Sequence, residues 1–160
     1  ILKNTNLLDI GSSPGGWSQI ASSIIKEGKI VAIDKKNMEK IKNVNFYKND
    51  FLEERSKNEI LKIFEKKIDV IVSDMAADTT GNKNLDCIRT NHLCLEVIDF
   101  STKILKKKGI LVSKLFMGED FLEVKETAKK KFNKVEFYKP KSSRSESRET
   151  YMFCSILNAL

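Results

Sequence analysis

The chain predicts a single α/β domain built on an open, mostly parallel β-sheet with helices on both faces. Apolar segments of strand length alternate with amphipathic segments of helix length along all 160 residues. A glycine-rich turn follows the first apolar segment, and an aspartate follows each of the next three. A chain of this length with 41% hydrophobic residues buries one core of ordinary size, so we expect no second domain.

The first half of the chain predicts four strands and two helices. The strands are short apolar runs, each ending in a turn or an acidic residue: Leu7–Ile10, Ile30–Ile33, Val44–Tyr47 and Ile68–Ser73. Apolar residues at helical spacing predict the two helices, Trp17–Lys26 and Glu54–Lys66. The first helix should stop near Gly28. The residues expected on the buried faces are Trp17, Ile20, Ala21, Ile24 and Ile25 in the first helix and Ile60, Leu61 and Phe64 in the second.

The second half predicts two further helices and three strands. A long helix is expected over Cys87–Lys107. Its last lysines suit the negative end of the helix dipole, and Gly109 is expected to stop it. The other elements are strand Ile110–Phe116, helix Asp120–Phe132, and strands Lys134–Tyr138 and Tyr151–Leu157, which flank a loop rich in serine and arginine.

The turn from Gly11 to Gly16 places three glycines within six residues, between a strand and a helix. Glycines let backbone N–H groups and a helix N-terminus approach a ligand closely. The spacing G-x-x-x-G-G differs from the G-x-G-x-x-G of dinucleotide-binding turns, which favours a cofactor without phosphates. From this motif alone, S-adenosylmethionine, a nucleotide and a purely structural turn all remain open.

Asp34, Asp50 and Asp74 follow the second, third and fourth predicted strands. Parallel strands deliver the residues after them to one edge of the sheet, where ligands bind. A carboxylate after the second strand suits the two hydroxyls of a ribose, and one after the third suits the amine of an adenine. Each aspartate can also be a helix cap or turn residue, but three at corresponding positions favour a binding role.

Lys114 lies within the apolar strand Ile110–Phe116, which has helices on both sides in sequence and is therefore expected to be central. A lysine in such a place loses water and is rare unless it is used. We expect Lys114 to act on a substrate proton, with Asp74 as a neighbouring carboxylate. The alternative is a lysine that snorkels from an edge strand.

Basic residues are concentrated near the end of the chain. The net charge is +7, and between Lys125 and Arg148 nine lysines or arginines accompany three glutamates. Such a segment is a candidate phosphate-binding surface. A solvated, lysine-rich helix face explains the same composition.

Cys87, Cys94 and Cys154 form no C-x-x-C pair, and we expect reduced thiols in a cytosol-like compartment. Together with His92 they do not complete a tetrahedral site, so we expect no metal. No apolar run of about 18 residues occurs, so we expect no membrane span. We expect a cytoplasmic monomer without an obligate protein partner, with a mitochondrion or other organelle as the alternative location.

Four separated motifs carry a family resemblance. They are the glycine turn, Ser73-Asp74-Met75-Ala76, Val112-Ser113-Lys114-Leu115-Phe116, and Lys139-Pro140-x-Ser142-Ser143-Arg144-x-x-Ser147-x-Glu149-x-Tyr151. In this order they resemble the FtsJ (RrmJ) family, whose members transfer a methyl group from S-adenosylmethionine to a ribose 2′-hydroxyl of RNA. The resemblance covers essentially all of residues 1–160. It implies a Rossmann-like class I methyltransferase fold with seven strands and an antiparallel last strand.

The resemblance also assigns roles to individual residues. The cofactor-binding positions fall on Gly11, Gly15, Trp17, Asp34, Asp50 and Asp74. Lys114 falls on the catalytic lysine, and Asp74 and Glu149 match two further members of a Lys-Asp-Lys-Glu constellation. For Glu149, the alternative is a surface ion pair with Arg148. The first lysine of the constellation lies upstream of the glycine turn in the family, so we expect residues 1–160 to form one domain that lacks the family's N-terminal segment.

RNA is the expected partner, because an enzyme that acts on a 2′-hydroxyl needs phosphate contacts to hold the strand. The candidate contacts are Lys139, Lys141, Arg144 and Arg148. The motifs resemble the branch that acts on a uridine of large-subunit ribosomal RNA more than the alternative branch, which acts on tRNA anticodon loops. An NAD-dependent short-chain oxidoreductase would show a Tyr-x-x-x-Lys pair, which this sequence lacks. A non-catalytic RNA-binding module has no need of a lysine in a central strand.

Overall fold

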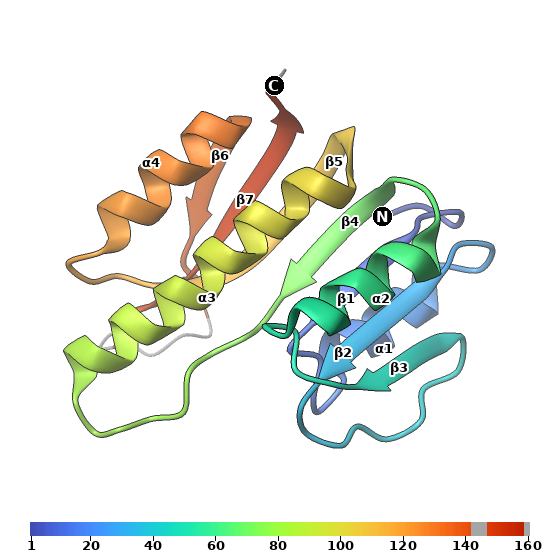
Figure 1. The fold of residues 1–160 in the computed structure, drawn as a ribbon, viewed down its shortest axis with the longest axis horizontal. Coiled ribbons are helices and arrows are strands. Elements are labelled where there is room, and N and C mark those ends of the chain that lie inside the picture. The colour runs from blue at the N-terminus through green and yellow to red at the C-terminus, as the bar shows by residue number, and fades with distance from the viewer. Residues whose placement is uncertain (142–146, 159–160) are drawn as a thin grey trace.

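The computed structural model describes residues 1–141 and 147–158 and forms one seven-stranded sheet (Figure 1). The strands are β1 (Leu7–Ile10), β2 (Ile30–Asp34), β3 (Val44–Lys48), β4 (Ile68–Ser73), β5 (Leu105–Phe116), β6 (Phe132–Tyr138) and β7 (Glu149–Leu157). The helices are α1 (Gly16–Ile24), α2 (Glu54–Phe64), α3 (Lys83–Ile104) and α4 (Phe121–Lys131).

The strand order is β3-β2-β1-β4-β5-β7-β6. Strand β7 is antiparallel to both of its neighbours, and the other neighbouring pairs are parallel. This arrangement confirms the predicted fold class, including the antiparallel last strand. The order reverses between β1 and β4, and ligands of open α/β sheets bind beyond the carboxyl ends of the strands at such a point.

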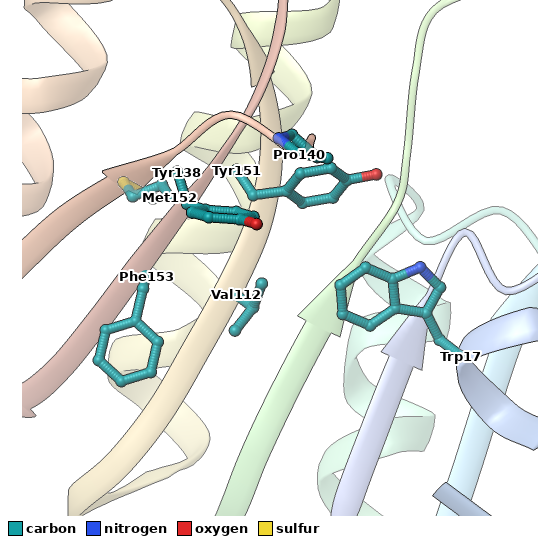
Figure 2. A pocket seen from close by; sticks show the side chains of 7 residues that line it. All are labelled: Trp17, Val112, Tyr138, Pro140, Tyr151, Met152 and Phe153. Carbon is teal, nitrogen blue, oxygen red and sulfur yellow. The ribbon is translucent and has the colours of Figure 1, made fainter. Parts of the chain in front are cut away.

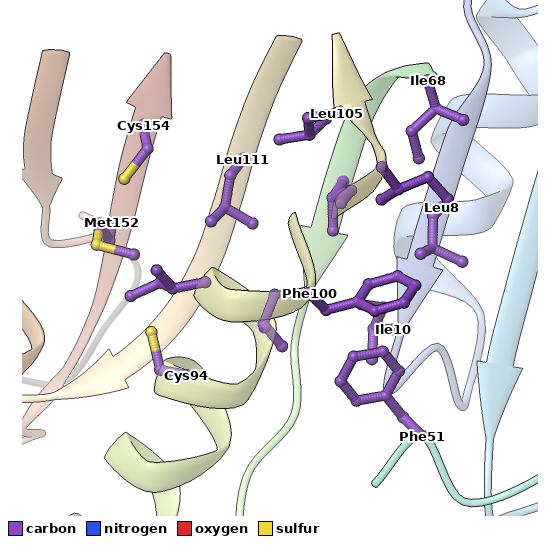
Figure 3. Close-up of a cluster of buried hydrophobic side chains, with 14 of the residues drawn as sticks. Leu8, Ile10, Phe51, Ile68, Cys94, Phe100, Leu105, Leu111, Met152 and Cys154 are labelled. Carbon is purple, nitrogen blue, oxygen red and sulfur yellow. The ribbon is translucent and has the colours of Figure 1, made fainter. Parts of the chain in front are cut away.

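The sheet buries two cores of unequal size, because among the described residues α2, α3 and α4 lie on one face and α1 alone lies on the other (Figure 1). The larger core joins all three helices to the sheet (Figure 3), and Phe51 meets Phe100 there edge to face, with ring centroids 5.3 Å apart. The smaller core packs Ala21 and Ile25 against Leu7, Val70 and Val72. Beyond it, the β5, β7 and β6 part of that face carries half-exposed side chains such as Val112 and Phe153.

The prediction for the first helix is wrong at its end and on part of its face. Helix α1 stops at Ile24, two residues before the predicted end, because Ile25 already has an extended backbone. Trp17, Ala21 and Ile25 pack as predicted, but Ile20 and Ile24, which were also expected on the buried face, are 62% and 38% exposed. The apolar face of α1 is wider than the strip of this helix that contacts the sheet.

The boundary between the third helix and fifth strand also differs from the prediction. Helix α3 begins four residues before Cys87, since the Asn82 side chain accepts hydrogen bonds from the first backbone N–H groups. It ends at Ile104, and the lysines at 106–108 lie in β5 rather than at a helix end. Leu105 is buried and pairs in register with Ile68 of β4. Strand pairing therefore ends the helix before Gly109 is reached.

All three cysteines are unpaired and buried, as expected of reduced core thiols. Among the described residues, no helix combines the length and apolar character needed to cross a bilayer. The same part of the chain contains no group of three or more histidine, cysteine or acidic side chains arranged to hold a metal ion.

Candidate active site and cofactor pocket

The glycine turn after β1 adopts conformations that require glycine. Gly11 and Gly15 have φ values of 73° and 118°, which side chains other than glycine rarely adopt. A Cβ on Gly11 would lie 2.6 Å from Met75 Cγ, so the turn also packs closely against the segment after β4. Gly15 caps α1 without a side-chain hydrogen bond.

A pocket of about 740 Å³ opens at this edge, and we call it the rim pocket. Its lining includes Gly11, Ser13, Asp34, Asp50, Met75 and His92. The structure thus brings three of the predicted cofactor residues, Gly11, Asp34 and Asp50, into one cavity. Trp17 lines a different hollow on the α1 face of the sheet (Figure 2). Gly15 and Asp74 line neither cavity. The cofactor roles of all six residues stay predictions.

Two aspartates of the rim pocket are held by backbone N–H groups. The Asp34 carboxylate accepts hydrogen bonds from Ser13 N at 2.9 Å and Lys36 N at 2.7 Å. Asp50 accepts one from Leu52 N at 2.9 Å. Asp34 and Asp50 thus also act as turn residues, which was the alternative that the sequence left open. The same hydrogen bonds fix their carboxylates at the pocket wall. Asp50 also forms an ion pair with the exposed Lys35, whose Nζ lies 3.2 Å from Asp50 Oδ2.

Asp9 is a functional candidate that sequence reasoning missed. It is fully buried in β1, Ser18 Oγ donates a 2.6 Å hydrogen bond to its Oδ2, and its Oδ1 has no partner among the described residues. Burial raises the pKa of Asp9 to about 6, and the charges of Asp74 and Asp34 act in the same direction. An acid inside the apolar run Leu7–Ile10 was the available signal, because buried carboxylates are rare unless paired.

The environment of Asp9 tests whether the pocket suits S-adenosylmethionine. Three carboxylates gather beneath the glycine turn, and one buried oxygen among them lacks a hydrogen-bond donor. The buried Ser12 Oγ also lacks a partner within the described part of the chain. Neither Asp9 nor Ser12 lines the rim pocket, but the nearby negative charges of Asp9, Asp34 and Asp74 favour a ligand that carries positive charge, whereas the phosphates of a nucleotide would meet repulsion. The residues therefore fit a cationic cofactor.

Lys114 lies between two carboxylates, one of which, Asp74, directly precedes Met75 of the rim pocket. Its Nζ is 2.9 Å from Asp74 Oδ1 and 3.7 Å from Glu149 Oε2, and its side chain is only 12% exposed. Strand β5 lies between β4 and β7, as the sequence predicted for a central strand, and the snorkelling alternative does not apply. The three residues come from the ends of three adjacent strands. Tertiary structure thus assembles the predicted catalytic group, although its chemical roles stay predictions.

Tyr151 is a second residue without a predicted role. It pairs in register with Lys114 across β5 and β7, and its hydroxyl donates a 2.7 Å hydrogen bond to Asp74 Oδ1. Burial raises the pKa of Tyr151, and the hydrogen bond to Asp74 and the nearby charges raise it further. The hydroxyl therefore acts as a fixed donor. The side chains of Tyr151 and Lys114 converge on one oxygen of Asp74.

Arg148 and Glu149 point to different partners. Glu149 faces Lys114, whereas Arg148 Nη1 donates to Asn84 Oδ1 at 3.0 Å and to Cys87 Sγ at 3.6 Å. Of the predicted phosphate contacts, Lys139, Lys141 and Arg148 are exposed. Arg144 lies outside the described residues.

An open sheet with a glycine turn after β1, acids at its carboxyl edge and an antiparallel last strand defines the class of Rossmann-like methyltransferases. The FtsJ-like methyltransferase family matches residues 1–156, and the chain belongs to that family. This membership confirms the resemblance drawn from the motifs. It also sets aside the oxidoreductase and the non-catalytic RNA-binding module.

The chain is similar to proteins called ribosomal RNA large subunit methyltransferase E. That of Pelagibacter ubique (strain HTCC1062) is 46% identical over 158 residues, which cover 98% of this chain and 78% of the relative. That of Rickettsia felis (strain ATCC VR-1525 / URRWXCal2) is 41% identical over 93% of this chain and 68% of the relative. The crystal structure of a ribosomal RNA methyltransferase from Plasmodium falciparum superposes with a TM-score of 0.85 at 32% identity, covering 97% of this chain and 87% of the other.

Proposed function

We propose that this protein transfers a methyl group from S-adenosylmethionine to the 2′-hydroxyl of a uridine ribose in large-subunit ribosomal RNA. The observation that carries this proposal is Lys114, held between Asp74 and Glu149, with Asp74 directly before Met75 of the rim pocket. The names of the relatives that are 46% and 41% identical support the choice of ribosomal RNA. The bacterial relatives also favour a cytoplasmic location, and a monomeric single domain over residues 1–160 remains our expectation.

The rim pocket is the proposed cofactor site. When bound, S-adenosylmethionine supplies an electrophilic methyl group on a positively charged sulfur. Asp34 accepts hydrogen bonds from ribose hydroxyls, and Asp50 accepts one from the adenine amine. The buried Asp9 carboxylate adds negative charge that favours a positively charged sulfur. Gly11 is needed in this turn because any side chain there would collide with Met75, which also lines the pocket.

Lys114 is the proposed catalytic residue. Its Nζ holds the 2′-hydroxyl. Either the neutral amine takes up the hydroxyl proton, or the charged amine stabilises the negative charge that develops on the oxygen while the proton passes to water. Asp74 and Glu149 hold Nζ from two sides, so the amine has little freedom to turn away. Tyr151 fixes the Asp74 carboxylate through its hydrogen bond. Alignment of reacting groups by such a fixed set supplies several kcal/mol of barrier reduction.

The test is Lys114→Ala, measured with labelled cofactor and separate pools of large ribosomal subunits and tRNA. We expect wild-type protein to label the large subunit, and Lys114→Ala to lower the rate by about 10²- to 10⁴-fold. Calorimetry should show unchanged cofactor binding, which separates catalysis from folding. Lys62→Ala, on the exposed side of α2, is the matched control and should keep full activity.

Near-normal turnover by Lys114→Ala with cofactor still bound would remove the assigned role. Labelling of tRNA in place of the large subunit would favour the anticodon-loop branch. Mapping the modified nucleoside then decides whether the methyl group lies on a ribose or on a base.

A further inference from the structure

Lysines gather at the edge of the sheet opposite the rim pocket, where α2, α3 and α4 end and the strands after them begin (Figure 1). We call this surface the lysine edge, and its residues are 65–67, 103–108 and 129–131. These residues include nine lysines and one glutamate, an excess of eight positive charges, whereas the whole chain has a net charge of +7. The rest of the chain is therefore close to neutral.

The basic segment between Lys125 and Arg148 is divided by β6. Lys129–Lys131 end α4, and β6 then crosses the sheet before Lys139 and Lys141 follow at the opposite edge. Figure 1 shows α3 and α4 ending at one edge and β6 running away from it. The lysine edge is thus a surface separate from the predicted phosphate contacts near Glu149.

We propose that the lysine edge binds phosphates of the substrate RNA at a distance from the methylated nucleotide. This inference rests on the proposed function, because it takes the large ribosomal subunit as the substrate. Such a particle offers phosphates over a surface much larger than one nucleotide, and lysines bind them without regard to sequence. The lysine edge therefore anchors the particle while Lys114 acts on the target ribose.

Most ammonium groups of the lysine edge have no acidic partner. Lys103 pairs with Asp99, and Lys106 pairs with Asp69. The other seven lysines form no ion pair within the described part of the chain. Neighbouring lysines repel one another, and bound phosphates relieve that repulsion.

The need to complement helix ends explains only a small part of this charge. Three helices end at the lysine edge, and each carboxyl end carries about −0.5 of an elementary charge, so the excess of lysine charge is about five times larger. The last carbonyl groups of α4 also have donors already, because Asn158 Nδ2 donates to Lys129 O and Lys130 O. The ammonium groups of Lys129–Lys131 are therefore not needed as a helix cap.

The start of β5 presents its lysines in a bulge. Between the paired residues Leu105 and Ile110, four residues of β5 lie opposite Asp69 alone. The three consecutive lysines 106–108 are all exposed, although β5 is a central strand. Because a bulge disrupts the ladder and bends the strand, consecutive side chains can leave the sheet together. Adjacent cations of this kind suit successive phosphates of a nucleic acid backbone.

The distance to the catalytic group predicts which RNA can use the lysine edge. Lys108 and Lys114 are six residues apart in β5, which is about 20 Å along a strand. RNA that contacts both at once must span at least that distance. Folded ribosomal RNA meets this condition, whereas a short fragment around the target nucleotide does not.

The experiment uses the double variant Lys107→Ala, Lys108→Ala, and sedimentation with purified large ribosomal subunits at several salt concentrations. We expect its affinity at low salt to be about 3- to 30-fold lower than that of wild type. The dependence of log affinity on log salt should become less steep by about 1.4 to 1.8, because two phosphate contacts are lost. Affinity for an RNA fragment that extends less than about 20 Å from the target ribose should not change.

Two controls separate a local contact from net charge. Lys107→Arg with Lys108→Arg keeps both charges and should bind the subunit as wild type does. Lys40→Ala with Lys48→Ala removes the same charge from two exposed lysines outside the lysine edge and should leave the salt dependence unchanged. Equal salt dependence of wild type and the Lys107→Ala, Lys108→Ala variant would overturn the inference, and so would an equal loss in the Lys40→Ala, Lys48→Ala control.

A lipid surface is the other source of phosphates, and vesicles that contain an anionic phospholipid test it. Vesicle binding that is lost in the Lys107→Ala, Lys108→Ala variant while subunit binding is kept would overturn the inference. Wild-type protein that binds the subunit but methylates no ribosomal RNA would overturn the proposed function alone, because these binding measurements do not need methyl transfer.

Discussion

Replacing Asp9 by asparagine should make the protein more stable at neutral pH and weaken its binding of cofactor. The asparagine side chain keeps an oxygen that can accept the hydrogen bond from Ser18, and it removes a buried negative charge. The pKa of Asp9 is raised from 3.8 to about 6, so the folded protein holds a proton there that the unfolded chain releases. A difference of about two pH units corresponds to ~3 kcal/mol.

The sign of the pH dependence follows from the raised pKa. Between about pH 4 and pH 6 the folded state binds more protons than the unfolded state at this residue, so stability decreases as pH rises through this window. The full penalty is present above the folded pKa. The free energy of unfolding of Asp9→Asn should therefore match that of wild type near pH 4 and exceed it by up to about 3 kcal/mol at pH 8.

Urea unfolding of both proteins between pH 4 and pH 8 measures this difference directly. Ser18→Ala is a useful companion, because loss of its hydrogen bond removes a contribution that lowers the pKa of Asp9. Its stability should fall by a larger total amount between pH 4 and pH 8 than that of wild type, because the window of falling stability extends to higher pH. A difference between wild type and Asp9→Asn that stays constant across this range would refute the reasoning. Calorimetry should also show weaker binding of S-adenosylmethionine by Asp9→Asn, and unchanged binding would remove Asp9 from the cofactor site.

Two further predictions follow from the site and the basic segment. Tyr151→Phe loses the hydrogen bond to Asp74 and should lower kcat about tenfold, with the fold retained; steady-state kinetics measures this, and an unchanged kcat would show that Asp74 needs no such support. Lys141→Ala should reduce the dependence of log affinity for RNA on log salt by about 0.7, measured by fluorescence anisotropy at several salt concentrations; an identical slope would exclude Lys141 as a phosphate contact.

Much of the site could be predicted because it follows from order along the chain. An aspartate after a parallel strand must emerge at the carboxyl edge of the sheet, so Asp34 and Asp50 reach the rim pocket. Lys114 lies in a strand flanked by helices, and β5 is accordingly central. The conformation at Gly11 was also foreseeable, since glycine-rich turns between a strand and a helix use positive φ.

Other features depended on contacts between distant parts of the chain. Ile20 is spaced like a buried residue, yet it is exposed because no element of the described residues covers that side of α1. The lysines at 106–108 look like a helix end, but pairing of Leu105 with Ile68 makes them part of a strand. Periodicity shows which side chains can share a face, and it does not show what lies against that face.

Local chemistry along the chain was sufficient for the alternating α/β layout, the turn at Gly11 and the carboxylates at one edge, because strand direction and glycine geometry are properties of short segments. Packing across the sheet was needed to bring Glu149 and Tyr151 of β7 to Lys114 of β5 and to leave Asp9 Oδ1 buried without a partner among the described residues. These contacts join residues far apart in sequence. Antiparallel register and burial, rather than spacing, decide them.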